Sequence, residues 1–460
     1  MAHYTHKQAV VIGSGIAGLV AARVLTEHFE KVAIVERDML LDTPAARNGV
    51  PQGRHPHLLL KRGEMILEQL FPGLGQKLND SGAMPLNVGQ DFRWFALGQW
   101  RPSYTSSINT IGASRPLLET TVRRYLAKNP QVDFLSKSEV IGLETSADGT
   151  KAIGLRVRSR SSLIGHNSIA ADFIVDASGR DSAAPEWLRD LGFPLPEETV
   201  VNGFSGYASR LYRAKTGMGW KGMYIQPFAP EFTRGGIILP MEENIWQVCM
   251  IGMAKDYPPT DEKGFMEFAL SLPSSEIYDA IKDAEPLSSI SGFRPFGNRL
   301  FHYERLPRYL ENFVLIGDSL NAFNPVYGQG MSVAAMSAIE LGNCLREHLS
   351  SHDDLTGLAQ HFQQKVVEVT AFPWQIAISE DARWSATEGN MPAPTPEDML
   401  MQNYLANVLI AANINPNVLE AFYSVLQMIE SPEIFFRPDI VMQVMALSNA
   451  VIPELTAVFA

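Results

Sequence analysis

Cysteine is scarce in this chain, and its scarcity excludes two kinds of stabilising site. The 460 residues contain 2 cysteines, Cys249 and Cys344, in unrelated sequence contexts. A disulfide framework needs several paired cysteines, and a zinc centre needs clustered Cys or His ligands. We therefore expect reduced thiols that serve as buried packing residues, and we predict no metal site.

Positive charge is also in short supply. The chain has 38 Lys and Arg against 50 Asp and Glu, which gives a formal net charge of -12. We find no basic face that would neutralise the phosphates of a nucleic acid. The composition therefore excludes nucleic-acid binding and favours a small-molecule partner.

Long hydrophobic runs are missing as well. The N-terminal MAHYTHKQ has no basic region followed by an apolar stretch, and the apolar segment 440–460 is interrupted by Gln443, Asn449, Pro453 and Glu454. We predict no secretory signal, no transmembrane segment and a cytoplasmic location. For 440–460 we favour a terminal helix that packs on the body, with contact to a membrane surface as the alternative.

Glycine, by contrast, is placed informatively near the N-terminus. Residues 9–36 read AVVIGSGIAGLVAARVLTEHFEKVAIVE, which predicts a strand, a turn at Gly13, Gly15 and Gly18, a helix, a second strand and an acidic end at Glu36. Such a unit binds a dinucleotide, because the turn lets backbone N–H groups approach a pyrophosphate at the helix N-terminus. We therefore predict a dinucleotide-binding unit.

Two later segments look like flavin-site elements. Residues 172–182 read DFIVDASGRDS, and residues 313–331 read FVLIGDSLNAFNPVYGQGM. With the N-terminal unit, and in this order, they resemble the flavoprotein monooxygenases of the p-hydroxybenzoate hydroxylase superfamily, which hold one FAD with three separated stretches. The D-A-S-G-R at 176–180 is similar to flavin halogenases and polyether-type flavin epoxidases, and the VPQGRHPH at 50–57 is similar to the same epoxidases.

The resemblance implies roles for individual residues. The first glycine turn would cradle the pyrophosphate, Glu36 would accept from the adenosine ribose, Val140 would meet adenine through its backbone, and Asp318 would hold the ribityl hydroxyls. The second glycine-rich helix start would offer N–H groups to the flavin ring. The predicted cofactor-binding residues are Gly13, Ser14, Gly15, Ala17, Gly18, Glu36, Arg37, Arg54, Arg115, Val140, Asp318, Pro325, Gly328, Gly330 and Met331.

The predicted fold class is α/β, with a discontinuous Rossmann-like FAD-binding domain, a β-rich substrate domain and a C-terminal helical region, since 460 residues exceed one ordinary core. We place the FAD-binding domain at 1–85, 113–180 and 297–350, the substrate domain at 86–112 and 181–296, and the helical region at 351–460. We also expect helix within 55–70, a hairpin at 91–100 and no strand beyond 351.

The run at 50–57 supplies the candidate catalytic residues, Arg54 and His55. Arg54 would stabilise negative charge on the ring or meet a phosphate, and His55 or His57 would donate a proton during oxygen transfer, because imidazole titrates near neutrality. The alternative is an ordinary loop before a helix. The His-x-His pattern lacks an acidic or Cys partner, so it does not predict zinc.

Aromatic residues are frequent in the proposed substrate domain. A sheet that covers a flavin needs an apolar inner face for a hydrophobic substrate. We predict substrate contacts from Phe92, Trp94, Phe204, Tyr224, Phe228 and Trp246. The W-x-W-x-I-P box of flavin halogenases is absent, so oxygen insertion ranks ahead of halogenation.

The resemblance implies an FAD-dependent monooxygenase that inserts one oxygen atom from O2 into an apolar alkene or aromatic metabolite, by epoxidation or hydroxylation, in secondary metabolite biosynthesis. NAD(P)H would reduce the FAD directly, or a separate flavin reductase would supply electrons, because D-A-S-G-R departs from the Asp-Gly pair of the hydroxylases. The alternatives are a reductase of isoprenoid double bonds of the geranylgeranyl reductase type, a halogenase and a non-catalytic flavin-binding protein.

Overall fold

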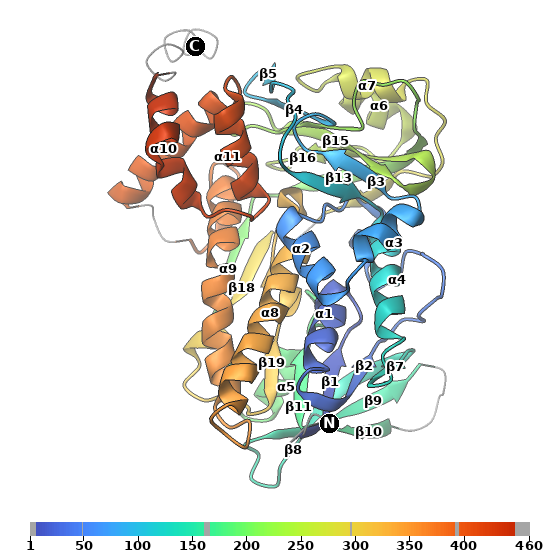
Figure 1. Cartoon of the computed structure of the whole chain (residues 1–460), viewed down its shortest axis with the longest axis vertical. Coiled ribbons are helices and arrows are strands. Elements are labelled where there is room, and N and C mark those ends of the chain that lie inside the picture. Colours follow the sequence, from blue (N-terminus) through green and yellow to red (C-terminus); the bar gives the residue numbers. More distant parts are fainter. Residues whose placement is uncertain (1–5, 48, 161–165, 295–296, 392–394, 447–460) are drawn as a thin grey trace.

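The protein is described by a computed structural model that covers residues 6–47, 49–160, 166–294, 297–391 and 395–446. Figure 1 shows two layered bodies stacked along the long axis, with a group of helices beside the upper one. The rest of segment 440–460, from residue 447 onward, lies outside the described residues. Within them, no helix combines the length and the apolarity needed to cross a membrane.

The lower body is built on a five-stranded parallel sheet in the order β19-β11-β1-β2-β7. Its strands are buried on both faces, as parallel sheets require, and β1 contributes four consecutive buried residues from Ala9 to Ile12. The strands are β1 (His6–Ile12), β2 (Phe29–Val35), β7 (Val132–Leu135), β11 (Phe173–Asp176) and β19 (Phe313–Leu315).

Helices cover one face of this sheet and a small antiparallel sheet covers the other. Helices α1 (Ile16–Leu25), α8 (Gly330–Leu349) and α9 (Leu358–Ala382) run side by side on the first face. The small sheet has the order β10-β9-β8. Its strands are β8 (Ser138–Thr145), β9 (Ala152–Ser159) and β10 (His166–Ala170).

The upper body is a seven-stranded sheet in the order β17-β13-β16-β15-β14-β4-β5, with α6 (Glu262–Leu270) and α7 (Glu276–Ile281) on its outer face. The hairpin predicted at 91–100 is confirmed, with Leu97 and Gly98 both at positive φ in its turn. The strands are β4 (Phe92–Ala96), β5 (Gln99–Trp100), β13 (Gly206–Arg213), β14 (Gly222–Ile225), β15 (Arg234–Met241), β16 (Ile245–Gly252) and β17 (Ser291–Phe293).

The remaining elements complete the two bodies and the group of helices beside the upper one. The helices are α2 (Lys61–Leu70), α3 (Leu74–Asp80), α4 (Arg115–Leu126), α5 (Ala184–Asp190), α10 (Pro396–Ala412) and α11 (Pro416–Leu426), and the short 3-10 turns are Pro51–Arg54, Glu242–Asn244, Tyr303–Arg305, Gly317–Ser319, Pro325–Tyr327 and Pro432–Phe436. The strands are β3 (Met84–Asn87), which pairs with β6 (Asn109–Gly112), and the sheet β20 (Asn321–Ala322), β18 (Asn298–Phe301), β12 (Glu198–Asn202) and β21 (Glu388–Gly389).

One local prediction is wrong and another is confirmed only in part. The region beyond 351 is not wholly helical, because β21 pairs with β12 as an edge strand. The helix expected within 55–70 is present, but it begins only at Lys61, because Pro56 keeps His55 in an extended conformation.

The proposed domain boundaries also differ from the packing. Ala184, Leu188 and Phe193 fall in the range assigned to the substrate domain, yet they are buried in the core of the lower body. Leu358 and Phe362, from the range assigned to the C-terminal helices, pack in the same core. The cofactor half of the molecule is therefore larger than the sequence indicated.

Candidate active site

The N-terminal glycines divide by what surrounds them. A Cβ on Gly18 would lie 1.9 Å from the carbonyl oxygen of Gly13, and a Cβ on Gly13, at φ +96°, would lie 2.6 Å from the carbonyl oxygen of Ala177. At Gly15 the nearest atom to such a Cβ is Nη2 of Arg115, 3.9 Å away. Chain packing therefore requires glycine at positions 13 and 18, whereas Gly15, the N-cap of α1, borders open space.

The start of α8 borders open space too. A Cβ on Gly328, at φ +66°, would lie 3.6 Å from Cβ of Leu58, and one on Gly330 would lie 3.8 Å from Oδ1 of Asp318. Gly179, in the middle flavin-like segment, has no atom within 4 Å of a Cβ. These glycines form a cradle that side chains would narrow, and its two helix N-termini suit the phosphates and the ring of an FAD.

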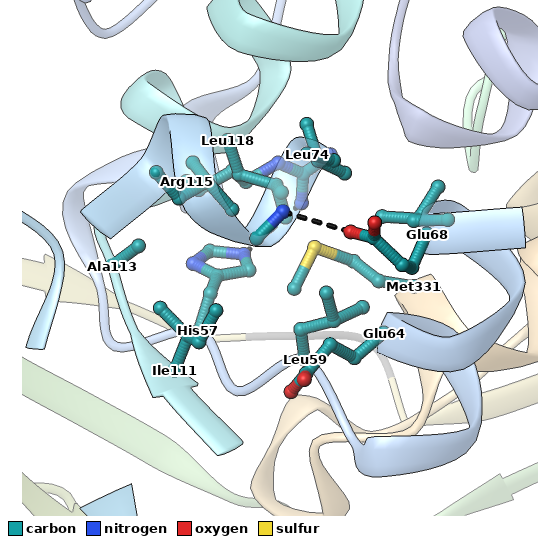
Figure 2. A pocket seen from close by; sticks show the side chains of 13 residues that line it. His57, Leu59, Glu64, Glu68, Leu74, Ile111, Ala113, Arg115, Leu118 and Met331 are labelled. Atoms are coloured by element: carbon teal, nitrogen blue, oxygen red, sulfur yellow. Dashed lines mark hydrogen bonds between the residues drawn. The ribbon is translucent and has the colours of Figure 1, made fainter. Parts of the chain in front are cut away.

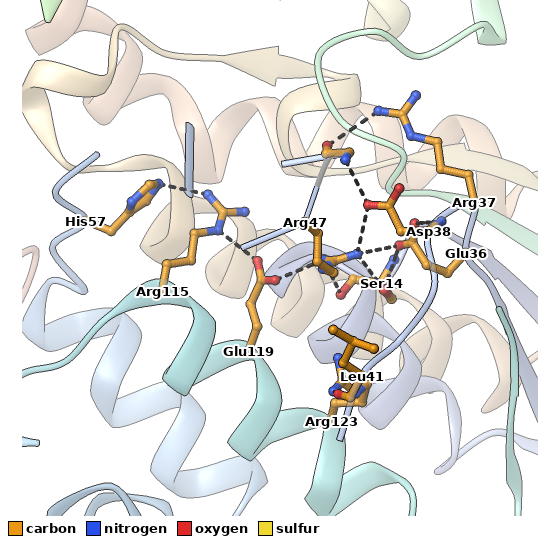
Figure 3. A network of polar contacts seen from close by, with 11 residues as sticks. Ser14, Glu36, Arg37, Asp38, Leu41, Arg47, His57, Arg115, Glu119 and Arg123 are labelled. Carbon is orange, nitrogen blue, oxygen red and sulfur yellow. Dashed lines mark hydrogen bonds and ion pairs between the residues drawn. The ribbon is translucent and has the colours of Figure 1, made fainter. Parts of the chain in front are cut away.

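A chain of charged side chains runs along this cradle (Figure 3). Arg115 donates from Nε to Glu119 over 2.8 Å, and its Nη1 lies 3.0 Å from Nε2 of His57. Arg47 bridges the next gap, 2.9 Å from Glu119 and 3.0 Å from Glu36. The network therefore alternates cations and anions from α4 to the end of β2.

Pairing decides the ionisation of this network. Burial alone would raise the pKa of Glu119, but Arg115 and Arg47 outweigh it and hold the pKa below its ordinary value. Burial would likewise raise the pKa of Glu36. The charge of Arg47 and the hydrogen bonds from Ser14 and Asp38 outweigh it, and the pKa lies below its ordinary value. Both carboxylates are therefore ionised at neutral pH.

His57 is the neutral end of the network. Its Nδ1 donates to the carbonyl oxygen of His55 over 2.9 Å, so its Nε2 is the acceptor that faces Arg115. Burial and the charge of Arg115 lower the pKa of His57 to about 3. His57 thus orients Arg115 as an uncharged partner.

Asp318 lies where three arginines converge. Burial raises the pKa of its carboxyl, while Arg115, Arg180 and Arg299 act in the opposite direction. Among the described residues, no group donates a hydrogen bond to its carboxylate within normal distance, which leaves its acceptors available to ligand hydroxyls. Asp176 differs, because Ser178 N–H and the Ser182 hydroxyl occupy its carboxylate and shape the turn.

A narrow pocket opens beside this site (Figure 2). His57, Arg115 and Met331 line it together with mostly apolar side chains of α2, α3, α4 and their flanking segments, and with two acids of α2. The lining residues are His57, Leu59, Glu64, Leu67, Glu68, Leu74, Gly75, Leu78, Ile111, Ala113, Arg115, Leu118 and Met331. Two predicted cofactor residues thus border a cleft.

Of the two candidate catalytic residues, His55 contacts the substrate sheet through its side chain. His55 is buried, and its Nδ1 lies 2.8 Å from the Ser209 hydroxyl on β13. Burial, with the charge of Arg54, lowers the pKa of His55 to about 4. The expectation that His55 titrates near neutrality is therefore wrong, and at neutral pH it is an uncharged hydrogen-bonding group. Arg54 itself is exposed.

Strand periodicity separates the predicted substrate residues onto two faces. Tyr224 and Trp94 lie on the inner face, with ring centroids 5.3 Å apart. Trp246 lies on the outer face, where it stacks on Trp220 in the core under α6 and α7. The prediction that Trp246 contacts the substrate is therefore wrong, because its side chain lies on the outer face of the sheet. We assign it a packing role.

The other predicted positions are scattered. Phe92 shares the strand of Trp94 and lies two residues before it. Phe204 carries Nζ of Lys255 4.0 Å from its ring, and Phe228 has Cζ of Arg383 5.1 Å from its ring. The structure places the remaining predicted cofactor residues as follows: Ser14 and Ala17 at the start of α1, exposed Arg37 after β2, Val140 on β8, and Pro325 in the turn before α8.

Sequence reasoning missed Asp381, at the end of α9. Its carboxylate is fully buried and accepts from Asn298 over 2.8 Å, from Asn324 over 3.2 Å and from the Tyr327 hydroxyl over 2.6 Å. Asn324 in turn accepts from the Tyr207 hydroxyl on β13 over 2.7 Å. Asp381 therefore ties the loop before α8 to the inner face of the substrate sheet.

Within the described part of the chain, the hydrogen-bond donors to the Asp381 carboxylate are all neutral. Burial raises its pKa to about 6, and the donors, which are Tyr327, Asn324 and Asn298, only partly oppose the rise. Nothing local in the sequence marks this residue, because its partners lie more than fifty positions away. Arg47 was missed for the same reason, since Glu119 is 72 residues from it.

Comparison with known proteins bears on this geometry. A model of the FAD binding domain family matches residues 6–367. The chain is 29% identical over 445 residues to Protein Rv3254 of Mycobacterium tuberculosis (strain ATCC 25618 / H37Rv), with 92% of this chain and 90% of that protein covered.

Two solved structures are similar to the whole arrangement. One is p-nitrophenol 4-monooxygenase PnpA from Pseudomonas putida DLL-E4, with a TM-score of 0.64 at 15% identity over 92% of this chain and 97% of that one. The other is the myxobacterial chondrochloren halogenase CndH, with a TM-score of 0.64 at 14% identity over 92% and 97%. The family match and the open glycine cradle agree that FAD is the cofactor. The chain belongs to the FAD binding domain family and has its p-hydroxybenzoate hydroxylase type of fold.

Proposed function

We propose that this protein is an FAD-dependent monooxygenase that inserts one oxygen atom from O2 into an apolar alkene or aromatic compound. The observation that carries the proposal is the inner face of the seven-stranded sheet, which meets the loop before α8. Tyr207, Cys249 and Ile251 cluster there with Val326 of that loop. The cofactor cradle thus adjoins a largely apolar wall.

Bound FAD supplies the redox chemistry, namely oxygen activation after reduction by NAD(P)H. The residues of the chain hold the reactants and keep water away. Gly15 and Arg115 suit the pyrophosphate, and the N-terminus of α8 suits the electron-rich edge of the flavin. Burial raises the pKa of the Cys249 thiol to about 12, so this wall carries no thiolate that would react with an oxidant.

His55 and Asp381 both reach the inner face of the substrate sheet, His55 at Ser209 and Asp381 through Asn324 and Tyr207. His55 is uncharged and offers Nε2 beside Tyr207 and Phe293, whose ring centroids lie 6.4 and 5.4 Å from its own. Asp381 holds a proton in the lower part of the physiological range and orients Tyr327. We propose that they position the substrate side of the site and that neither acts as a nucleophile.

The proposal includes epoxidation as one form of the oxygen insertion, on the likeness to polyether-type epoxidases. It also includes a separate flavin reductase as a source of electrons. Halogenation ranks behind oxygen insertion because the W-x-W-x-I-P box is absent, although CndH shares the fold. A role in secondary metabolism belongs to the same proposal.

The cofactor assignment is tested at Gly15. Gly15→Val should fold but retain only a small fraction of the roughly one FAD per chain expected for the native protein, because its side chain enters the space meant for phosphate. Gly219→Val is the matched control, since Gly219 also borders open space at an ordinary φ but lies in the substrate half. Flavin absorbance of the purified proteins gives the stoichiometry, and full flavin in Gly15→Val would refute the assignment.

The reaction class is tested by mixing the reduced, FAD-loaded protein with oxygen in a stopped-flow spectrometer. A monooxygenase should pass through a distinct transient absorbance before the spectrum of oxidised flavin returns. Direct return, with release of hydrogen peroxide, would favour the isoprenoid reductase or a non-catalytic flavoprotein instead.

A further inference from the structure

Arg101 is buried among aromatic rings at the junction of the substrate sheet and the C-terminal helices. Arg101 comes directly after β5 in the sequence and is 7% exposed. Its Cζ lies 4.2 Å from the ring centroid of Trp94 on β4 and 4.4 Å from that of Phe422 on α11. Nε donates to the Asn413 side chain over 3.1 Å. Two aromatic rings therefore contact the guanidinium from neighbouring directions, since the Trp94 and Phe422 centroids are 5.9 Å apart.

This cation has no anionic partner. No carboxylate of the described residues lies within ion-pair distance of Arg101, and its Nη1 is buried without a hydrogen-bond partner. The acid on α11, Glu420, faces another group, since the hydroxyls of Tyr104 and Ser106 each donate to it over 2.7 Å. Burial lowers the pKa of Arg101, but an arginine remains charged at neutral pH.

Burying an unpaired charge lowers the stability of the folded protein, and the contacts with the aromatic rings offset only part of the lost hydration energy. Packing alone does not call for it, because an apolar side chain of similar length would fill the same space. The groups that act on Arg101 are the phenols of Tyr423, Tyr224 and Tyr104, of which Tyr423 also makes a side-chain hydrogen bond with it, and all three phenols are neutral at physiological pH. The demand of this buried cation for a partner is thus a demand for an anion, which the described residues do not supply.

The position of Arg101 connects that demand to the substrate face. Trp94 contacts Tyr224, and Tyr224 belongs to the same inner-face cluster as Tyr207 and Val326 beside the flavin loop. An aromatic surface thus leads from the flavin loop to Arg101. Entry of a ligand group to Nη1 requires the ring of Phe422 or Tyr423 to turn aside.

We propose that Arg101 is the anion-binding end of the substrate site and that it receives a carboxylate carried by an otherwise apolar substrate. The planar guanidinium can bind both carboxylate oxygens, while the body of the substrate lies along Trp94 and Tyr224. The placement of the reacting end rests on the proposed monooxygenase function, whereas the recognition of the carboxylate does not.

The test measures binding to the full, FAD-loaded chain by isothermal titration calorimetry. The probes are two pairs that share their apolar body and differ in the end group, an anionic carboxylate or a neutral alcohol: 2-naphthoate with 2-naphthalenemethanol and decanoate with decanol. The native protein should bind at least one carboxylate about 10-fold more tightly than its alcohol, as charge-assisted hydrogen bonds predict. Arg101→Gln should lose the preference, and Arg101→Lys should keep part of it.

Arg93→Gln is the matched control. Arg93 also stacks on a tryptophan of the same hairpin, with Cζ 4.1 Å from the Trp100 ring, but it has a carboxylate partner in Glu276. Its replacement should leave the preference for carboxylates unchanged. Equal binding of acids and alcohols, retention of the preference in Arg101→Gln, or no carboxylate binding at millimolar concentration would each overturn the proposal.

A ligand-free measurement guards against loss of folding. If Arg101 is kept for binding, Arg101→Met should melt at the same temperature as the native protein or above it, whereas a structural role predicts a lower melting temperature. Carboxylate binding without oxygen activation would refute the monooxygenase proposal and leave the anion site intact. Oxygen activation without a carboxylate preference would do the reverse.

Discussion

The two halves of the molecule treat buried charge in opposite ways. Beside the FAD cradle, Glu36 and Glu119 are paired with Arg47, and their pKa values lie below the ordinary range. At the substrate sheet, Asp381 and Arg101 are buried without partners of opposite charge among the described residues. Paired charges hold a structure together, whereas unpaired ones are kept at a cost in stability. The contrast indicates where the chain keeps charges for purposes other than stability.

The contrast is broken most severely at Arg47. Arg47→Met leaves Glu36 and Glu119 buried with less compensation, so the free energy of unfolding of the FAD-free protein should fall by about 3–5 kcal/mol. Urea unfolding measures this change. Arg37→Met removes an exposed arginine from the same loop and should change stability by less than about 0.5 kcal/mol. Equal effects of the two changes would show that the network carries no special stability.

Asp381 should give the next largest effect, through pH. Its pKa is about 6 in the folded chain and about 3.9 when unfolded, so its contribution is complete below pH 4 and is lost as the pH rises through 6. The loss amounts to roughly 3 kcal/mol, and Asp381→Asn should remove this part of the pH dependence.

Unfolding free energies between pH 4 and pH 7 measure the difference between Asp381→Asn and the native chain. Glu380→Gln, which changes the partly exposed neighbour, is the control and should keep most of the native slope, because the charge of Glu380 is the smallest of the influences on the pKa of Asp381. Glu36 and Glu119 titrate in the opposite sense. Their stabilisation is present above the unfolded pKa of glutamate and is lost as the pH falls through their lower folded values. Superimposable profiles for Asp381→Asn and the native chain would contradict the unpaired state of Asp381.

The smallest effect sharpens the role of burial. Arg93 and Glu276 form an ion pair between β4 and α7, but each side chain is 34% exposed. Glu276→Gln should therefore cost at most about 1 kcal/mol in thermal or urea unfolding. A loss as large as that of Arg47→Met would mean that pairing, and not burial, sets the energy in both halves.

Local features of both halves were predictable from sequence. The glycines of the first turn, the hairpin at Leu97 and Gly98, and the start of α4 at Ser114 all depend on nearby residues. The Ser114 hydroxyl accepts from the backbone N–H of Leu117, as an N-cap should. These elements could be predicted because their determinants lie within a few positions.

The site itself was only partly predictable. Trp246 and Tyr224 both lie in aromatic strands, and only strand register assigns them to opposite faces. The sequence of this strand, IWQVCMIG, has one polar residue and is buried along almost all of its length, so it gives no alternation that would place Trp246 on either face. The pKa of His55 was not predictable, since its burial depends on β13, more than 150 residues away. Arg47 and Asp381 likewise needed the tertiary structure.

The attachment of the C-terminal helices has a practical consequence. The family match ends at residue 367, yet Gln427 beyond α11 accepts from the backbone N–H groups of Lys61 and Arg62 at the start of α2, over 2.7 and 3.0 Å. Asp381 and Phe422 also come from this later part. Exchanging residues 368–446 between homologues should therefore change substrate choice before cofactor affinity, and a chain truncated at 367 would uncover an apolar surface prone to aggregation.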